Sequence, residues 1–156
     1  MNFFKKILPK KLDQLVYVVH RETPLKTVAI QFDETASKIE VDDQETVMRH
    51  KLLINDEVAY KSNTHKKVHF LKTIGKYQYP VIGDCYTYEK FRGKSIYPYM
   101  LQKASITALK THDTVFILVS PENLASIRGI EKSGAVLHSR ITTIRFGVFY
   151  LFKKIR

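Results

Sequence analysis

Residues 79–135 decide the fold, and they read YPVIGDCYTYEKFRGKSIYPYMLQKASITALKTHDTVFILVSPENLASIRGIEKSGA. The apolar, β-branched start of this stretch predicts a strand over 79–87. Apolar residues at helical spacing then predict a helix over 95–110, with Pro98 in its first turn, where a missing N–H costs nothing. The run 115–119, VFILV, is wholly apolar and predicts a strand buried on both faces.

The sequence on both sides of these elements extends the pattern. A second helix is expected from Asn123 to Gly134, because glycine suits the left-handed conformation of a helix C-cap. Strands over 135–144 and 148–152 are expected to form a closing hairpin. The predicted fold class is therefore α/β, with a central, mixed but mostly antiparallel sheet flanked by helices. Before residue 79 we expect strands over 15–20, 28–32, 47–54, 58–62 and 68–74.

Length and composition bound the class of protein. A chain of 156 residues with 44% hydrophobic and 26% charged residues suits one globular domain over 1–156 and excludes a disordered or collagen-like chain. Cys85 is the one cysteine, which excludes an intramolecular disulfide and Cys-rich zinc sites, so no metal is expected. No apolar run approaches the roughly 20 residues of a membrane span. Together with the lack of a signal-peptide pattern, these features predict a cytoplasmic protein.

The net charge of +11 lies in the C-terminal two thirds of the chain. Residues 1–50 hold eight Lys or Arg and eight Asp or Glu, whereas residues 51–156 hold eighteen and seven. Such a surface attracts nucleic acid, anionic lipid or a phosphorylated small molecule, and composition does not choose among them. The acidic stretch 33–45 is interpreted as a solvated face or loop.

The first twelve residues are a separate basic feature. Over residues 1–12, Phe, Ile and Leu alternate in helical fashion with four lysines, although Pro9 limits a continuous helix. Basic amphipathic helices of this kind lie on anionic membranes. Two interpretations follow, namely a turn that packs on the body of the protein and peripheral membrane contact.

Residues 92–97, RGKSIY, join the strand at 79–87 to the helix that follows it. Unpaired backbone N–H groups and the positive end of the helix dipole favour an anion such as phosphate at this position. Arg92 and Lys94 add two cations. A nucleotide-binding Walker A loop is excluded, because it needs a glycine five residues before its Gly-Lys pair, where Tyr88 stands.

Two motifs resemble those of the GNAT acyltransferases. Residues 92–97 resemble the family's pyrophosphate loop, Arg/Gln-x-x-Gly-x-Gly/Ala. Phe91 stands at the aromatic position that precedes this loop in the family. Residues 123–134, NLASIRGIEKSG, resemble the family's Asn-x-x-Ala/Ser…Glu-Lys-x-Gly-Phe helix up to its glycine. The motifs occur in the family's order with a buried strand between them. The resemblance covers roughly residues 82–135 and implies a GNAT-like fold.

The resemblance also implies an N-acetyltransferase that moves an acetyl group from acetyl-CoA to a primary amine. The cofactor would lie in a V-shaped gap between two central strands. Its pyrophosphate would rest on the loop, its pantetheine arm would pair with the preceding strand, and Asn123 would touch that arm. The implied cofactor-binding residues are Cys85, Tyr86, Thr87, Arg92, Gly93, Lys94, Ser95, Ile96, Tyr97 and Asn123.

Four positions depart from the family pattern, one of which is Ala135, where the family usually has phenylalanine. Ser95 and Tyr97 replace small residues of the loop, and Ser95 adds a Cβ where the backbone approaches phosphate. Ile130 stands where many members have the tyrosine that protonates the leaving thiolate. Another hydroxyl or solvent must then supply the proton, or the domain binds CoA with little transfer.

The acceptor amine needs a base or a water path to remove its proton. Asp84 is our candidate base, because it is the acid at the end of the strand that would face the acceptor. Glu89 in the next loop, and His65 and His69 on preceding segments, are alternatives. Cys85 has no evident activating partner, so a buried core residue is a better interpretation than a nucleophile.

Three functional hypotheses follow. The leading one is an N-acetyltransferase of small-molecule amines. An amino sugar of surface-polysaccharide synthesis is the suggested acceptor, and an amino acid, a polyamine and a protein amine are the alternative acceptors. Tyr86 and Tyr88 would either line the acceptor pocket or pack in the core. The alternatives are a basic nucleic-acid-binding module, for which Lys, Tyr and Phe interleave over 66–97 without a known motif, and a degenerate GNAT domain that binds CoA. A homodimer is a further expectation from the resemblance.

Overall fold

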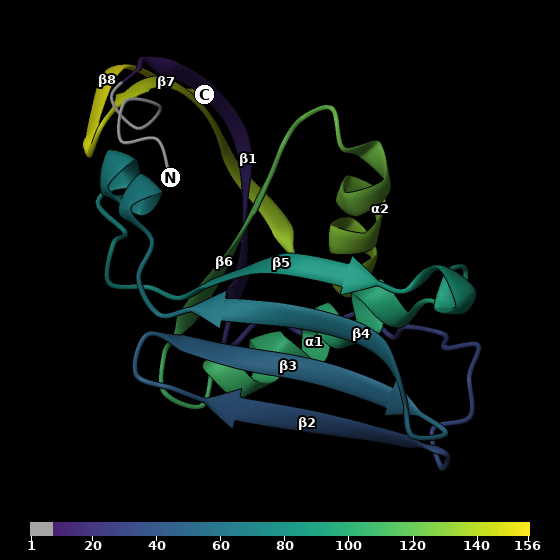
Figure 1. Cartoon of the computed structure of the whole chain (residues 1–156). Coiled ribbons are helices and arrows are strands. Elements are labelled where there is room, and N and C mark those ends of the chain that lie inside the picture. The colour runs from purple at the N-terminus through teal and green to yellow at the C-terminus, as the bar shows by residue number, and fades with distance from the viewer. Residues whose placement is uncertain (1–7) are drawn as a thin grey trace.

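Residues 8–156 are described by a computed structural model of the chain. Eight strands form one sheet in the order β2-β3-β4-β5-β6-β1-β7-β8 (Figure 1). The elements are β1 Lys10–His20, β2 Ser37–Asp43, β3 Val47–Ile54, β4 Glu57–His65, the 3-10 helix η2 His69–Ile74, β5 Val81–Thr87, the 3-10 helix η3 Glu89–Phe91, α1 Ile96–Ala108, β6 Thr114–Val119, α2 Leu124–Ser133, β7 Val136–Phe146 and β8 Phe149–Ile155.

The sheet is mixed but mostly antiparallel, as the sequence predicts. Strands β5 and β6 run parallel, and α1 connects them. The other neighbouring strands run antiparallel. Strand β1 lies between β6 and β7, so it is an interior strand of the sheet although it comes first in the chain order. It begins at Lys10, earlier than the predicted strand over 15–20.

Helices α1 and α2 lie on the same side of the sheet and pack against each other (Figure 1). Helix α1 packs on β4 and β5, and α2 packs on β6. Two hydrophobic clusters fill the space beneath them, one around Leu101 and Ile130 and one around Tyr60 and Met100. A third cluster around Phe70 lies on the opposite face, where η2 covers the sheet.

Both predicted helices are present, with short shifts at their ends. Gly134 ends α2 in the left-handed conformation, at φ 98°, as expected of a C-cap glycine. The strands predicted over 47–54 and 58–62 are also present, as β3 and β4, and a tight turn joins them. Asn55 and Asp56 have φ values of 51° and 64°, which is typical of the tight type I′ hairpin turn.

Residues 28–32 form no strand, and this prediction was wrong. The alternation that suggested a strand has another cause. Val28, Ile30 and Phe32 pack against the cluster beneath α1. An extended segment that covers a helix alternates buried and exposed residues just as a strand does, so its pattern predicts burial but not pairing.

The prediction of a strand over 68–74 was also wrong, because His69–Ile74 forms the 3-10 helix η2. Its buried residues are Phe70, Leu71 and Thr73. Residues three apart share a face of a 3-10 helix, so Phe70 and Thr73 face the sheet together. Gly75 ends the element at φ 69°.

The acidic stretch 33–45 is exposed, as interpreted, but it contains an edge strand that was not predicted. Strand β2 pairs with β3 along its whole length. Ion pairs within this surface join Lys38 to Glu40 and Arg49 to Asp42. A charged edge strand resists pairing with other chains, which explains how a charge run can occupy a strand.

The predicted amphipathic segment 1–12 lies outside the described residues up to residue 7. Residues 10–12, which the pattern placed in the same helix, are instead the first residues of β1. No helix found between residues 8 and 156 has the length and apolar character needed to cross a bilayer.

Candidate active site

Strands β5 and β6 separate soon after they begin. Within the described residues they pair only at Val81 and Ile82 of β5. The register between β4 and β5 then shifts, and Asp84 at this irregularity has a φ of 53°. A β-bulge bends its strand and increases the twist. The rest of β5 therefore turns away from β6, which leaves the V-shaped gap that the resemblance implies (Figure 1).

Consecutive residues of β5 face opposite sides of the sheet. Cys85 contacts the clusters beneath the helices, and burial raises the pKa of its thiol to about 11. Asp84 and Tyr86 are exposed on the other face. Strand β5 thus divides the site into two parts, which we call the helix side, facing α1 and α2, and the open side, facing away from them.

On the helix side, the loop before α1 presents backbone N–H groups. Gly93 at φ 77° and Ser95 at φ 59° are both left-handed. The N–H groups of Gly93, Lys94 and Ser95 have no hydrogen-bond acceptor in the described part of the chain. Gln31 donates its backbone N–H to the Lys94 carbonyl at 3.1 Å, which holds the loop in place. Unpaired amides at the start of a helix are suited to bind an anion.

Two basic residues of α2, which the sequence analysis did not assign, complete this surface. Lys132 donates a hydrogen bond from Nζ to the Ser95 hydroxyl at 2.7 Å. Arg128, one turn earlier, lines the same cavity as the loop. The i,i+4 spacing of these two residues in the second motif places them on one helix face and could have indicated them. The cavity has a volume of about 410 Å³, and its lining includes Thr87, Arg92, Gly93, Ser95, Ile96 and Tyr97.

The bulky Tyr97 is matched by a glycine on α2. A Cβ placed on Gly129 would lie 2.3 Å from the Tyr97 ring, so the ring packs directly on the α2 backbone. Ala125, one turn before Gly129, is also small and lines the cavity. The departure from the family pattern at Tyr97 is therefore accommodated by the second motif, and a cavity persists beside the ring.

A second cavity, of about 340 Å³, shares Thr87, Arg92, Tyr97 and Ala125 with the first. Cys85, Tyr86 and Ser126 also line it. Nearby on β4, the Tyr60 ring lies 6.5 Å from the Tyr97 ring. The Tyr60 and Ser62 hydroxyls are buried without a hydrogen-bond partner among the described residues. Two adjoining cavities thus lead from the loop at residues 92–97 along the end of β5.

Asn123 caps α2 and lines neither cavity. Its Oδ1 accepts the backbone N–H of Ser126 at 3.1 Å. An asparagine N-cap satisfies a helix donor that would otherwise lack a partner. The cap fixes where α2 begins, and contact between Asn123 and a cofactor stays a prediction.

On the open side, Asp84 joins two neighbours on β4. Asn63 donates from Nδ2 to the carboxylate at 3.0 Å, and His65 Nε2 lies 2.7 Å from the same oxygen. These two contacts hold the pKa of the Asp84 carboxyl below its usual value, although burial opposes the shift. A carboxylate with a lowered pKa is a weak proton acceptor, but it orients the His65 ring. The structure thus brings together two of the candidate bases as one His65–Asp84 pair.

The other candidate bases lie elsewhere. Glu89 is exposed in η3, and His69 lies on η2 with its ring 5.1 Å from Tyr77. Neither has a hydrogen bond to the His65–Asp84 pair in residues 8–156. Ile130 is fully buried beneath α2. Across the same residues, no cluster of three or more His, Cys, Asp or Glu could hold a metal ion.

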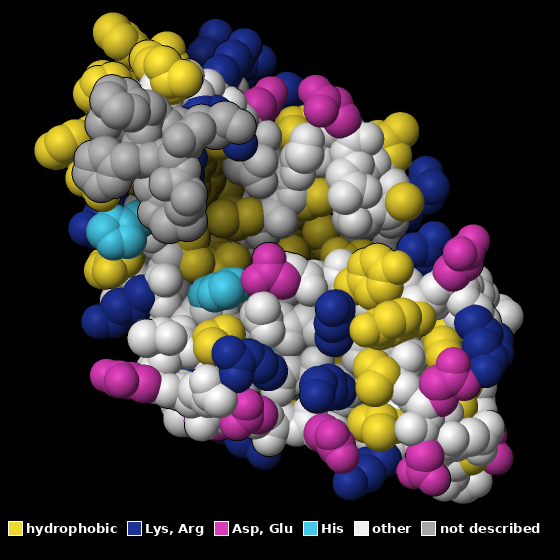
Figure 2. Space-filling view, viewed as in Figure 1, with side chains coloured by type: hydrophobic (Ala, Val, Ile, Leu, Met, Phe, Trp, Pro, Cys, Tyr) yellow, Lys and Arg dark blue, Asp and Glu magenta, His cyan; other side chains and the backbone are white. Residues whose placement is uncertain are grey.

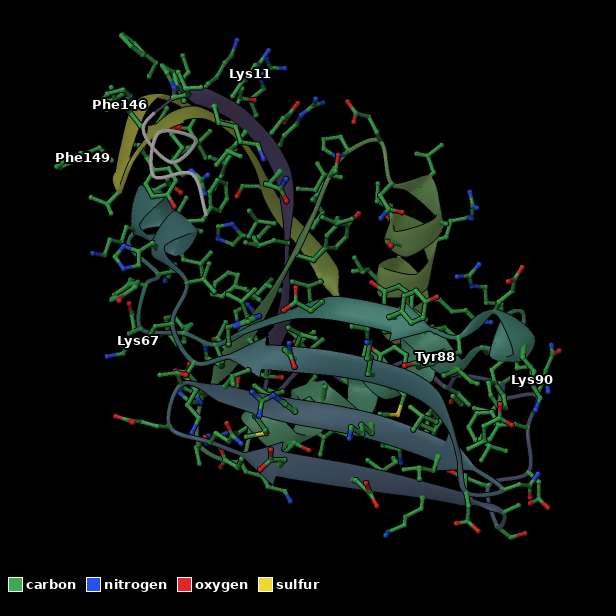
Figure 3. All side chains as sticks on the ribbon, in the orientation of Figure 1. Lys11, Lys67, Tyr88, Lys90, Phe146 and Phe149 are labelled. Atoms are coloured by element: carbon green, nitrogen blue, oxygen red, sulfur yellow. The ribbon has the colours of Figure 1, made fainter. Side chains whose placement is uncertain are left out.

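Tyr86 and Tyr88 form an exposed aromatic pair rather than part of the core. Their rings meet edge to face at 5.0 Å. The Lys61 ammonium lies 5.7 Å from one ring and 5.9 Å from the other. Figure 3 shows Tyr88 where β5 ends, beside the loop that leads to Lys90. The open side therefore offers aromatic and basic groups next to the gap.

No protein-family model and no curated protein matches the chain. Among solved structures, an acetyltransferase of the GNAT family from Colwellia psychrerythraea resembles it, with a TM-score of 0.59 and 13% sequence identity. The match covers 89% of this chain and 57% of that chain. The chain therefore has a GNAT-like fold. It spans little more than half the length of its structural neighbour.

Proposed function

We propose that the protein is an N-acyltransferase that moves an acetyl group from acetyl-CoA to a primary amine of a small molecule. The observation that carries this proposal is the division of the site by β5. An anion-binding loop with added cations lies on the helix side, and the His65–Asp84 pair lies on the open side of the same strand. The GNAT-like fold of the chain supports it.

The helix side fits a phosphorylated cofactor. The unpaired amides of Gly93, Lys94 and Ser95 would bind the pyrophosphate of acetyl-CoA, with Arg128 and Lys132 beside them. The small residues of α2 leave room for the cofactor, which supplies an activated acetyl group when bound. The residues 85–87, which line the second cavity, would border the pantetheine arm.

The open side fits an amine acceptor. With Nε2 of His65 donating to Asp84, Nδ1 of the ring carries the lone pair that would accept a proton from the amine. Asp84 would keep the ring in this orientation. Tyr86 and Tyr88 would border the acceptor.

A proton must also reach the departing thiolate, because Ile130 leaves no hydroxyl at the family's usual position. Tyr97 lines both cavities, and burial raises the pKa of its phenol above the usual value. A raised pKa makes this phenol a weaker acid than an ordinary tyrosine, so it is a poor proton donor to a thiolate. We therefore propose that solvent protonates the departing thiolate.

From composition and from the resemblance, we further propose that the chain forms a single domain over 1–156, works in the cytoplasm and assembles as a homodimer. An amino sugar of surface-polysaccharide synthesis is the acceptor that we favour.

Calorimetric titration of the purified protein with acetyl-CoA and with CoA, at low and at moderate salt, tests the proposal. We expect one-to-one binding in the micromolar range that persists at moderate salt. Amine acceptors, amino sugars first, are then screened by measuring the release of free CoA thiol.

Three other outcomes separate the alternatives. Binding of CoA without transfer to any amine would indicate a degenerate domain. Absence of CoA binding, with steeply salt-dependent binding of a single-stranded oligonucleotide, would favour the nucleic-acid-binding module. If the protein binds neither CoA nor the oligonucleotide, the cavities beside α1 do not hold the proposed ligand.

A further inference from the structure

The β7–β8 hairpin carries an exposed apolar surface. Phe152 is 84% exposed, Val148 68% and Phe149 66%. Figure 3 shows Phe146 and Phe149 near the outer end of the hairpin, pointing away from the body of the protein. Clusters of large apolar side chains in contact with water mark interaction sites.

The strand register places Phe149 on one face of the hairpin with three other apolar side chains, whereas Phe152 lies at an irregularity of β8 with a φ of 51°. Ile144 pairs with Leu151, and Phe146 pairs with Phe149. Side chains of paired residues lie on the same face of a sheet. One face of the hairpin therefore carries all four apolar residues, and Lys11 joins them because it pairs with Ile144.

The helices leave this part of the sheet uncovered. Lys11 shares a face of β1 with Leu15 and Tyr17, which pack beneath α1 and α2. Those helices pack chiefly on β4, β5 and β6. Figure 1 shows the tip of the β7–β8 hairpin at a different end of the molecule from α1 and α2.

Positive charge surrounds the apolar surface. Residues 136–156 contain five Lys or Arg and no Asp or Glu, and residues 66–79 contain four Lys and no Asp or Glu. Two of these cations, Arg140 and Lys66, have carboxylate partners. Figure 2 shows hydrophobic side chains beside Lys and Arg at the upper left, where Figure 1 places the hairpin. The surface therefore suits a partner that is both apolar and anionic.

A groove of about 330 Å³ lies between η2 and the hairpin. Lys72 and His69 line it from η2, and Lys153 lines it from β8. Phe149 and Tyr150 supply its aromatic wall. Two ammonium groups beside aromatic rings match a phosphate that is attached to an apolar chain.

A second copy of the chain fits this surface poorly. Two such surfaces would bring like charges together, which opposes association. Strand addition at the edge of β8 is also disfavoured, because Phe152 has a φ of 51° and Lys153 and Lys154 follow it. Irregular backbone and lysines protect an edge strand from pairing.

We propose that the β7–β8 hairpin docks the protein on an anionic phospholipid surface. Phe149 and Phe152 would enter the boundary between head groups and acyl chains, while Lys72 and Lys153 would contact lipid phosphates. This proposal goes beyond the acyltransferase function and does not depend on it.

Co-sedimentation of the whole chain with vesicles tests it. One set of vesicles is pure phosphatidylcholine, and the other contains about one third phosphatidylglycerol. We expect binding to the anionic vesicles that weakens with salt, and little binding to the neutral ones. Phe149→Ser with Phe152→Ser, and separately Lys72→Glu with Lys153→Glu, should each lower the partition coefficient about tenfold or more.

Matched controls change the same kinds of residue elsewhere. Leu124→Ser removes another exposed apolar side chain, on α2, and Lys103→Glu with Lys110→Glu reverses two charges on and just after α1. Both should bind anionic vesicles within about twofold of the parent chain. Circular dichroism shows whether each variant is folded.

Several results would overturn the proposal. Equal binding to both kinds of vesicle would show that the positive charges do not contribute to docking. Unchanged binding of the variant with both phenylalanines replaced would show that the hairpin is not the docking site. Absence of binding at low salt would reject docking altogether. A concentration-dependent dimer that Phe149→Ser with Phe152→Ser abolishes, without vesicle binding, would make the hairpin an interface between copies of the chain.

Discussion

Neighbouring residues of β5 have opposite environments on the two sides of the sheet. On the helix side, Cys85 lies among apolar residues, and burial raises the pKa of its thiol to about 11. On the open side, Asp84 is exposed, and its contacts with Asn63 and His65 lower the pKa of its carboxyl. One peptide bond separates a group that keeps its proton from one that loses it.

This difference shows that position in the sheet decides which titratable groups can exchange protons. A buried thiol stays protonated at neutral pH, whereas an exposed, hydrogen-bonded carboxylate stays ionised. Proton transfer from the acceptor is therefore expected on the open side, and cofactor binding on the helix side. Substitutions on the open side should change turnover, and those on the helix side should change affinity.

The largest expected effect belongs to the open side. His65→Ala should lower kcat by about a hundredfold or more, because it removes the proposed general base. The dissociation constant of acetyl-CoA should stay within about twofold, since His65 is on the other face. Steady-state kinetics and calorimetry measure the two quantities.

His112→Ala, near the end of α1, is the matched control and should leave turnover unchanged. Asp84→Asn should also lower turnover more than cofactor affinity, because it weakens the orientation of the His65 ring. Turnover of His65→Ala equal to that of the parent chain, at every pH, would remove this pair from the mechanism.

Cys85 should react slowly with iodoacetamide. Because the thiolate is the reactive form, a pKa raised from 9.0 to about 11 reduces the rate at pH 8 about a hundredfold relative to an unperturbed thiol. The rate should rise about tenfold per pH unit up to pH 11 while the protein stays folded. Mass spectrometry follows the modification. Fast labelling of the folded protein at pH 8 would contradict the burial of this residue.

Arg92→Glu should weaken CoA binding at least about tenfold. Arg92 lines both cavities, and the substitution places a negative charge beside the amides proposed to hold pyrophosphate. Calorimetry measures the change, with Lys110→Glu as a control of equal charge change. Equal affinities for the Arg92 variant and the parent chain would mean that the loop does not hold the cofactor.

The smallest effect is expected from Lys132→Ala, which should weaken CoA binding about twofold to fivefold. Its hydrogen bond to Ser95 is exposed, and exposed polar contacts contribute little. A double-mutant cycle with Ser95→Ala measures the coupling between the two residues. Strictly additive effects would show that this contact does not support the loop.

Local sequence patterns predicted the elements that have a clear signature in their own residues. The apolar run at β6, the helical stripe of α1 and Gly134 at the end of α2 all appear as expected. The same reasoning was wrong at 28–32 and 68–74, because alternation or apolar content reports burial and not the partner that provides it. Edge strand β2 was not predicted, since an exposed strand needs no apolar face.

The candidate site also has one part that the sequence could predict and another that depends on tertiary contacts. Residues 92–97 are contiguous, so the loop and its helix could be predicted from sequence. The His65–Asp84 pair depends on the register between β4 and β5, including the irregularity at Asp84. The fit of Tyr97 against Gly129 depends on how α1 and α2 pack. No local pattern carries either relation.

The sequence by itself therefore determined the α/β character, the loop at residues 92–97 and the two helices beside it. These features rest on contiguous residues, whose periodicity and capping act over a few positions. Only the tertiary structure decided that β1 lies between β6 and β7, that β5 leaves β6 after two residue pairs, and that His65 meets Asp84. Each of these joins residues far apart in the chain, and the register and packing that bring them together are properties of the whole sheet.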